Sequence, residues 1–466
     1  MKNLTKTILA SRPGQEERPM KRFFFIPGNM ARNMIKLLLC ALFCSLSAGR
    51  AWADGAVYAM TNALGNNQIL VYARASDGSL SSTPIQTIAT GGGGSGLQLA
   101  AVDSLGSAGG VQLNAGHNLL FAVNANSASA NNGAGSYNTD CGQGSITSFS
   151  VASDGTLTVV AQVSSGGLFP NSLAVRQDLL YVLNAGGPGT CSESPNITGF
   201  RVDGAGHMSS IGSTQPIDPG PPAGSGENCV DAAGFEALTG APAADFACGL
   251  NPPSFSRSPA QVRFTPGGNR LVVTVKGTNT IYVFTVNNNG KAVSPTITQA
   301  PGPALPTFLG FTFDKRNHLL VTELFGAATT IPAGGQGSVS SFTVTTTGEL
   351  ESISSHVSDG GTAACWIALE PTAGKYAYVS NNLSASISSY AVGTNGSVTL
   401  IAGSAATASG PNDLATAEEG GASFLYAVEA GSGTVGAFQI NLTNGSLTPI
   451  TGGGGLPTGA QGLAAF

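Results

Sequence analysis

The chain repeats one unit, a strand followed by a tight turn and a second strand, and this repeat restricts its fold more than any other feature. One copy runs from Gly144 to Val159, with Asp154-Gly155 between its two apolar runs. Asp-Gly and Asn-Gly indicate hairpins when alternating apolar residues flank them, because these residues accept the positive φ that primed turns need. Seven copies are recognisable, and their turn glycines are Gly78, Gly155, Gly204, Gly290, Gly348, Gly396 and Gly445.

The spacing of the turns predicts the architecture. Successive turn glycines are 77, 49, 86, 58, 48 and 49 residues apart, which fits a base period of about 48 residues with insertions. That period suits a four-stranded propeller blade, which must pack against like blades around an axis because it cannot bury both faces alone. With 65 glycines and 10% charged residues, the composition also favours short strands over helices. We therefore expect an all-β, seven-bladed β-propeller as a single domain over residues 54–466.

The two remaining strands of each blade lie upstream of the hairpin. Inner strands often begin with proline, as in Pro170–Val175, Pro259–Phe264 and Pro411–Leu414. Second strands follow them, as in Leu119–Asn124, Leu180–Asn184 and Tyr378–Asn381. After residue 53 the chain starts with a second strand, Val57–Asn62, and it ends on an orphan inner strand, Leu456–Ala464. We therefore expect the N- and C-terminal strands to pair and close the ring.

Residues 1–53 have the pattern of a secretory signal peptide with an upstream extension. Lys36 precedes an apolar run, Leu37–Leu46, and Ala51-Trp52-Ala53 forms a small-x-small cleavage site before Asp54. Met20 and Met34 are alternative starts. The run is too short to span a bilayer, which takes about 20 apolar residues, so we predict no membrane span and a periplasmic or secreted protein.

Charge and cysteine content limit the partners and the compartment. Without residues 1–53 the chain carries 11 Lys and Arg against 23 Asp and Glu, a balance that disfavours nucleic acid and anionic membranes. Export permits disulfides, and of the three possible pairings of four cysteines we favour Cys229 with Cys248 and Cys141 with Cys191. Cys365 lies in an expected strand and is interpreted as a buried free thiol. No cysteine or histidine spacing indicates zinc.

Two segments point to a known family. Leu180–Asn184 and Lys375–Asn382 are each followed by a Ser/Ile/Phe strand and a hairpin. They resemble the YVTN-type repeat of seven-bladed propeller lactonases, the 6-phosphogluconolactonase-like family, over about residues 56–466. The resemblance implies histidine and arginine at the mouths of inner strands. This chain has Ala260-Gln261 where Arg-His is implied, which leaves Arg263 as the nearest cation.

Candidate site residues fall where inner strands begin and second strands end, because both points open on one face of a propeller. The long insertions at about 125–144, 185–195, 214–257 and 324–336 lie there, and loops of this kind often carry function. Glu323 and Glu429 stand where other blades have asparagine. They are the candidate acid/base residues, with Arg263 as their catalytic electrostatic partner. The candidate substrate-binding residues are Asn124, Asn184, Gln261, Lys276, Asn381 and Asp413.

Each assignment has a simpler alternative. The asparagines can serve only to bond nearby backbone and cap a turn. A divalent cation held by Asp413 together with the carboxylates Glu323 and Glu429 is considered, but no metal site or other cofactor is assigned. His117 and His318 fall in turns at the opposite face, so no histidine base is expected at the axis. Few cations remain, which favours neutral or weakly acidic lactones over phosphosugars.

Two functional hypotheses remain open. The first is an exported lactonase-like hydrolase that opens a sugar lactone or related cyclic ester at the axial entrance. The second is a non-catalytic propeller that binds carbohydrate or an envelope protein partner through its inserted loops. Turnover of lactones separates the two.

Overall fold

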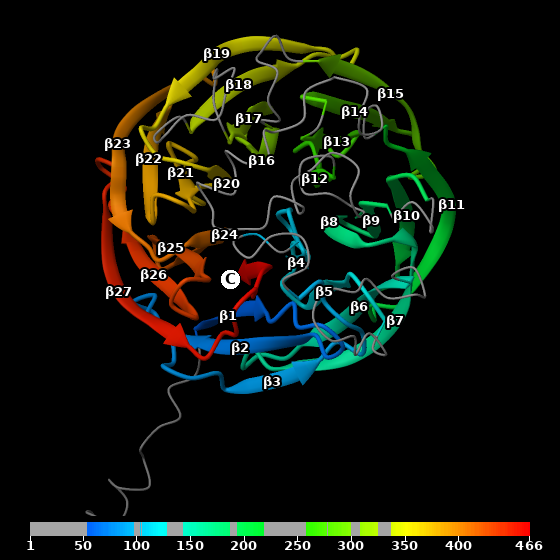
Figure 1. The fold of residues 1–466 in the computed structure, drawn as a ribbon, viewed down its shortest axis with the longest axis horizontal. Coiled ribbons are helices and arrows are strands. Elements are labelled where there is room, and N and C mark those ends of the chain that lie inside the picture. Colours follow the sequence, from blue (N-terminus) through cyan, green and yellow to red (C-terminus); the bar gives the residue numbers. More distant parts are fainter. Residues whose placement is uncertain are drawn as a thin grey trace, which may run out of the picture. The chain divides into compact units, whose positions relative to one another are not determined.

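The computed structural model describes residues 54–96, 103, 105–127, 143–186, 193–218, 258–276, 278–299, 308–324 and 337–466. In these ranges the chain forms seven antiparallel four-stranded sheets, arranged as blades around an axis (Figure 1). The prediction of an all-β, seven-bladed propeller is confirmed. The described ranges contain no helix, and hence none long and apolar enough to cross a membrane.

Each blade consists, from the axis outwards, of an inner, a second, a third and an outer strand. Blade 1 is β28 (Leu463–Ala465), β1 (Gly55–Met60), β2 (Gln68–Arg74) and β3 (Gln86–Ala89); blade 2 is β4 (Val111–Leu113), β5 (Leu119–Asn124), β6 (Gln143–Val151) and β7 (Leu157–Leu168); blade 3 is β8 (Pro170–Arg176), β9 (Leu179–Asn184), β10 (Asn196–Val202) and β11 (Met208–Pro216). Blade 4 is β12 (Pro259–Phe264), β13 (Arg270–Val275), β14 (Thr280–Val286) and β15 (Ala292–Gln299); blade 5 is β16 (Phe308–Phe313), β17 (His318–Glu323), β18 (Ser338–Val344) and β19 (Leu350–Ser358). Blade 6 is β20 (Ala364–Leu369), β21 (Tyr376–Asn381), β22 (Ser386–Val392) and β23 (Val398–Thr407); blade 7 is β24 (Pro411–Glu419), β25 (Ala422–Glu429), β26 (Thr434–Ile440) and β27 (Leu447–Gly454).

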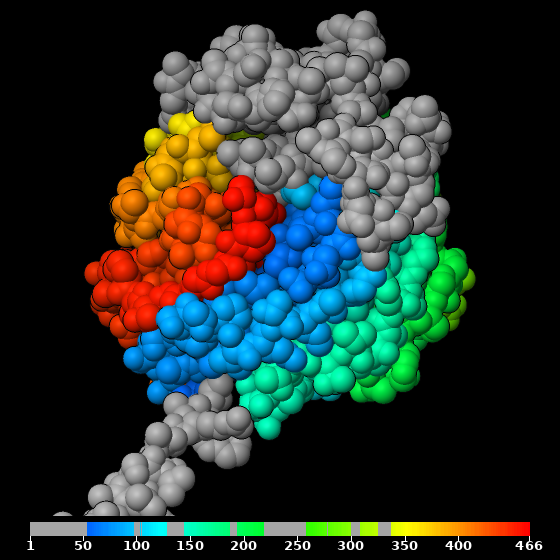
Figure 2. All heavy atoms as spheres, turned by 60° about the horizontal axis from the view of Figure 1, so that its bottom comes forward, coloured from blue at the N-terminus to red at the C-terminus, as the bar shows by residue number. Residues whose placement is uncertain are grey.

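The ring closes by pairing its two ends. Strand β28 pairs antiparallel with β1, Tyr58 facing Ala464, and so supplies the inner strand that blade 1 lacks. Figure 2 shows these N-terminal and C-terminal segments side by side. The guanidinium of Arg74, only 1% exposed, donates from Nε to the Phe466 carbonyl at 2.8 Å and from Nη2 to the Asp54 carbonyl at 3.1 Å. The predicted closure is confirmed, and Arg74 fastens it.

The core lies between blades. Second strands such as β5 are buried at every position, because a neighbouring blade covers each of their faces. Outer strands such as β23 are mostly exposed or half-buried. In one shared cluster, Val272 of β13 and Val283 of β14 pack with Leu319 and Val321 of β17. The blades are therefore stable only as a ring, as expected for units that cannot bury both faces alone.

Tyrosines of the second strands join neighbouring blades. Tyr58, Tyr181, Tyr378 and Tyr426 donate their phenolic hydrogens to carbonyls of turn glycines in the next blade. The acceptors are Gly155 at 2.8 Å, Gly290 at 2.7 Å, Gly445 at 3.1 Å and Gly78 at 2.9 Å. Burial raises the pKa of each phenol, so each stays a donor at neutral pH. The tyrosine of the YVTN-type repeat and the glycine of the hairpin therefore form one structural contact.

Several sequence-based predictions lie outside the described residues. These are the signal peptide, the central parts of the four insertions, and Cys141, Cys191, Cys229 and Cys248. Within the described residues the free cysteine is Cys365, which is buried as expected.

Candidate active site and a separate axial pocket

The ring has two faces that the inner strands define. Inner strands begin at what we call the entrance face, and they end in turns at the opposite, turn face. Five polar side chains gather on the axis at the entrance face, and we call them the axial cluster. They are between 0% and 4% exposed. Their members are Asp103, Lys276, Cys365, Asp413 and Gln461.

Gln461 and Lys276 tie the connection before β4 to the axis. The Gln461 amide nitrogen donates to Asp103 Oδ1 at 2.5 Å and to the Ser107 carbonyl at 2.7 Å. Its amide oxygen accepts from the Leu105 N–H at 2.7 Å. Lys276 Nζ donates to the Gly106 carbonyl at 2.5 Å. Within the described part of the chain, Asp103 Oδ2 is buried without a hydrogen-bond partner, which is unusual for a carboxylate.

Burial controls the protonation of the cluster. It raises the pKa of Asp103, with the nearby Lys276 ammonium opposing the rise. It also lowers the pKa of Lys276, here against the attraction of Asp103, so desolvation outweighs pairing at both groups. Burial, helped by the negative charge of Asp103, raises the pKa of Asp413 to about 7. Burial therefore moves the pKa values of these two carboxyls and of the lysine towards neutrality, a pattern common among catalytic groups.

The segment 105–110, which we call the cover, bonds the axial cluster through the Gly106 carbonyl and the Leu105 N–H. The Ser107 hydroxyl donates to the Asn171 carbonyl at 2.6 Å, and the Ala108 N–H donates to the Ala260 carbonyl at 3.2 Å. The Leu173 N–H donates to the Gly109 carbonyl at 2.9 Å. Gly106 and Gly109 have φ of 59° and 80°, values that suit glycine. These bonds join the cover to blades 3 and 4.

The structure does not bring Glu323 and Glu429 to the axis, contrary to the sequence-based expectation. Glu323 accepts from the hydroxyls of Ser338 and Ser340, the latter at 2.7 Å, and its Oε2 lies 2.9 Å from His356 Nδ1. These partners are on β18 and β19, the third and fourth strands from the axis. Glu429 accepts from Thr434 of β26 at 2.9 Å. Both carboxylates therefore point outwards within their own blades.

The asparagines at the same position explain this arrangement. Asn124 donates to the Thr147 hydroxyl at 3.0 Å, Asn184 to the Asn196 side-chain oxygen at 2.9 Å, and Asn381 to the Ser388 hydroxyl at 2.8 Å. Each partner lies on the third strand of the same blade. A hydroxyl on the third strand can accept a bond from an asparagine amide, and it can donate one to a glutamate carboxylate. The exchange of asparagine for glutamate preserves a link within the blade and does not mark an axial acid.

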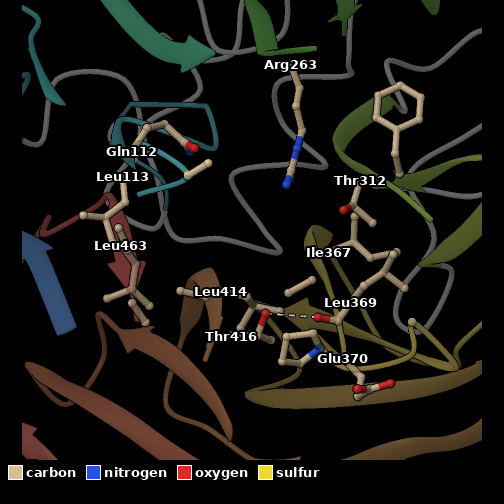
Figure 3. Close-up of a pocket in the computed structure, with 18 of the residues that line it drawn as sticks. Gln112, Leu113, Arg263, Thr312, Ile367, Leu369, Glu370, Leu414, Thr416 and Leu463 are labelled. Atoms are coloured by element: carbon tan, nitrogen blue, oxygen red, sulfur yellow. Dashed lines mark hydrogen bonds between the residues drawn. The ribbon is translucent and has the colours of Figure 1, made fainter. Parts of the chain in front are cut away.

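Gln261 and Arg263 lie on the same inner strand but in different surroundings. Gln261 is buried, and its side-chain oxygen accepts from the Phe311 N–H at 2.7 Å, joining β12 to β16. Arg263 is exposed and lines a pocket of about 410 Å³. Residues of turns at the turn face, among them His117 and Lys315, also line this pocket, but no member of the axial cluster does. Figure 3 shows the Arg263 side chain extending from β12 into the cavity.

Of the predicted site residues, the structure places Lys276 and Asp413 in the axial cluster, where both act on Cys365, and sets Arg263 apart in the pocket. Sequence reasoning missed Asp103 and Gln461, which belong to no motif and meet only when the ring closes. Among the described residues, no group of three or more His, Cys, Asp and Glu is arranged to hold a metal ion. The divalent cation considered at Asp413 therefore has no ligand set in that part of the chain.

Comparisons with known proteins agree with the fold. Residues 249–459 match the family described as "Lactonase, 7-bladed beta-propeller". A putative 6-phosphogluconolactonase from Bacteroides fragilis is 17% identical with a TM-score of 0.59, over 90% of this chain and 99% of that one. The periplasmic gluconolactonase of Pseudomonas aeruginosa is 15% identical with a TM-score of 0.60, over 88% and 98%. At these identities the structural likeness shows the fold alone, and no curated protein matches the sequence.

Proposed function

We propose that this propeller hydrolyses a lactone at the axial cluster. Its sequence is similar to the lactonase family over residues 249–459, and its fold is similar to that of solved lactonase-like propellers, as the sequence-based resemblance predicted. The observation that carries the proposal is the position of Asp413, a buried carboxyl with a pKa of about 7 in the same axial cluster as the buried Lys276, with Cys365 near both. Lactone hydrolysis needs a base for water and a positive charge or N–H donors for the developing oxyanion.

The residues of the cluster divide these roles. Asp413, partly ionised at neutral pH, accepts a proton from the attacking water as the water oxygen bonds to the carbonyl carbon. The ring C–O bond then breaks, and the proton passes to the leaving alkoxide, giving the open hydroxy acid. Lys276 holds the carbonyl oxygen, while Asp103 and Gln461 keep the lysine and the cover in place.

The contact between Lys276 and Gly106 supports this assignment of roles. Lys276 Nζ already binds a carbonyl oxygen, at 2.5 Å, where a lactone carbonyl is proposed to sit. Substrate binding then requires the 105–110 segment to move away from the axis, so that the substrate carbonyl replaces that of Gly106. Glycines at positions 106 and 109 suit such a movement.

The substrate class follows from the charge of the cluster. It holds one lysine against two aspartates, a balance that disfavours a phosphorylated sugar and favours a neutral sugar lactone.

We also propose export to the periplasm or beyond. The apolar run and cleavage pattern in residues 1–53 support this, as does the likeness to a gluconolactonase named as periplasmic.

Acid release from a panel of neutral and phosphorylated sugar lactones, followed in a pH-stat, tests the proposal. We expect Asp413→Asn to lower kcat by about 10²–10⁴-fold, because the general base is lost. The matched control is Asp359→Asn, another buried carboxyl with a raised pKa, which bonds Ser388 away from the axis. It should keep its turnover, as should Glu323→Gln and Glu429→Gln. Equal turnover in Asp413→Asn and wild type would overturn the assignment of the base.

The closed cover is the one observation that favours the second hypothesis, a non-catalytic binding propeller. The axial cluster is buried, and Lys276 bonds the Gly106 carbonyl of segment 105–110. If no lactone is hydrolysed and a glycan or protein partner binds tightly instead, the hydrolase proposal fails and the binding function replaces it.

A further inference from the structure

We propose that the pocket at the turn face is a separate binding site for a small carboxylate with an apolar body, held by Arg263. This inference does not depend on the proposed lactonase activity, because no residue of the axial cluster lines the pocket. Its volume of about 410 Å³ falls within the usual range of small-molecule sites.

Arg263 has the properties of a binding residue. Its guanidinium makes no hydrogen bond or ion pair with any described residue, and its side chain is exposed in the pocket. Arg74, the buried arginine of the ring closure, shows the contrast: its guanidinium bonds the carbonyls of Asp54 and Phe466 and the carboxylate of Glu419. An arginine that only supports the fold is expected to find such partners. Arg263 keeps all five of its N–H donors for a ligand.

Arg263 also interrupts an otherwise apolar or small layer of inner-strand side chains. Arg263 pairs with Val272, three residues before the end of the second strand of its blade. The residues with the same pairing on β8, β16, β20 and β24 are Ala174, Thr312, Ala368 and Ala415. These residues occupy equivalent positions in their blades and so form one layer around the axis. The single charge in that layer has no structural counterpart in these other blades.

The other charged groups that line the pocket leave its positive charge in place. Glu370 accepts N–H bonds from Thr372 at 2.5 Å and from Ala373 at 2.9 Å, so its carboxylate is bound to its own turn. Lys315 adds a second positive charge, with Nζ donating to the Thr372 carbonyl at 2.5 Å. Burial lowers the pKa of His117, so this imidazole is neutral at neutral pH. The pocket therefore favours an anion.

The walls decide which kind of anion fits. Aliphatic side chains from four blades surround the cavity (Figure 3), and they are Leu113, Ile367, Leu369, Leu414 and Leu463. The hydroxyl of Thr416 is engaged by the Leu369 carbonyl at 3.1 Å. Polar side chains line the rest of the cavity: Asn114 bonds Asn118 in its own turn, and Gln112 and Thr312 lie beside the aliphatic residues. A small carboxylate can bond the guanidinium by a bidentate pair, while a short aliphatic or aromatic body packs on the aliphatic part of the walls.

Calorimetric titration of the full chain with benzoate, octanoate, benzamide and inorganic phosphate tests the site. We expect the two carboxylates to bind. We expect Arg263→Gln to weaken them by about 10–100-fold through loss of a charge-assisted pair, and Arg263→Lys to weaken them less. Benzamide and phosphate should bind more weakly than benzoate, because each lacks one of the two features that the pocket recognises.

Two further variants keep the test specific. Arg176→Gln removes the same charge at the turn face from an arginine that bonds the Pro266 carbonyl at 2.8 Å and does not line the pocket. It should bind the carboxylates like wild type. Ala415→Leu fills part of the cavity without changing its charge, and it should weaken octanoate and benzoate. Failure of both carboxylates to bind wild type, or undiminished binding in Arg263→Gln, would overturn the inference.

Discussion

The ionisation of Asp413 should make the stability of the ring fall as pH rises, and replacing this residue by asparagine should remove much of that dependence. Burial raises the pKa of Asp413 from 3.8 to about 7 in the folded protein. Between these values the folded state holds a proton that the unfolded chain has released, so the free energy of unfolding decreases with increasing pH. A shift of about 3 pKa units corresponds to about 4 kcal/mol lost between pH 4 and pH 7.

Asp413→Asn cannot ionise, and its side-chain oxygen can still accept the Gly462 N–H that now bonds Asp413 Oδ2 at 3.0 Å. We therefore expect the variant to equal wild type near pH 4.5 and to exceed it at pH 7.5 by up to about 4 kcal/mol. Urea unfolding at pH 4.5, 6 and 7.5, followed by the fluorescence of the buried Trp366, measures this difference. Asp103 remains in the variant, so some decline between pH 4 and 6 should persist.

The matched control is Asp178→Asn, which replaces an aspartate whose side chain is 55% exposed. It should follow the wild-type profile at every pH. If Asp413→Asn also runs parallel to wild type, or is less stable at pH 7.5, then the Asp413 carboxyl is not protonated in the folded state as its burial implies, and its proposed role as a base at neutral pH loses its physical basis.

Three further outcomes test the contacts that hold the ring together. Arg74→Ala, at the ring closure, should lower the free energy of unfolding in urea by about 3–5 kcal/mol, because it leaves buried polar groups unpaired. The control Arg201→Ala removes an exposed ion pair and should cost less than about 1 kcal/mol. Equal costs would argue against the role of Arg74 in the closure. Gly78→Ala should lower the unfolding midpoint, because Gly78 has φ of 81° and an added Cβ would lie 2.1 Å from the Phe424 ring of blade 7. The control Gly204→Ala, whose added Cβ would have nothing within 4 Å, should have little effect. Cys365 should resist iodoacetamide in the native protein and react only after denaturation, because it is buried and burial raises the pKa of its thiol. Mass spectrometry of the peptide that contains Cys365 measures the labelling, and labelling of the native protein would contradict this burial.

The fold was accessible from the sequence because its signals are local. Each Asp-Gly or Asn-Gly turn lies between the two strands that it joins, and the period of about 48 residues follows from one blade being one unit. The pairing of Tyr58 with Ala464 joins opposite ends of the chain, yet it was predictable because the two terminal fragments complement each other as one blade. Residues 1–53 and the four cysteines of the proposed disulfides lie outside the described residues, so those assignments stay predictions.

The candidate site was predictable only in part, because the direction of a side chain at a strand end depends on its neighbours in space. Glu323 and Asn381 occupy equivalent positions, and hydroxyls on the third strand hold both within their blades, a bond that no local pattern reveals. Asp103 and Gln461 are 358 residues apart and meet only after the ring has closed. Short-range hairpin chemistry therefore determined the architecture from the sequence alone. Only the packing of seven blades around one axis decided which polar groups are buried together and which, like Arg263, are left to face open space.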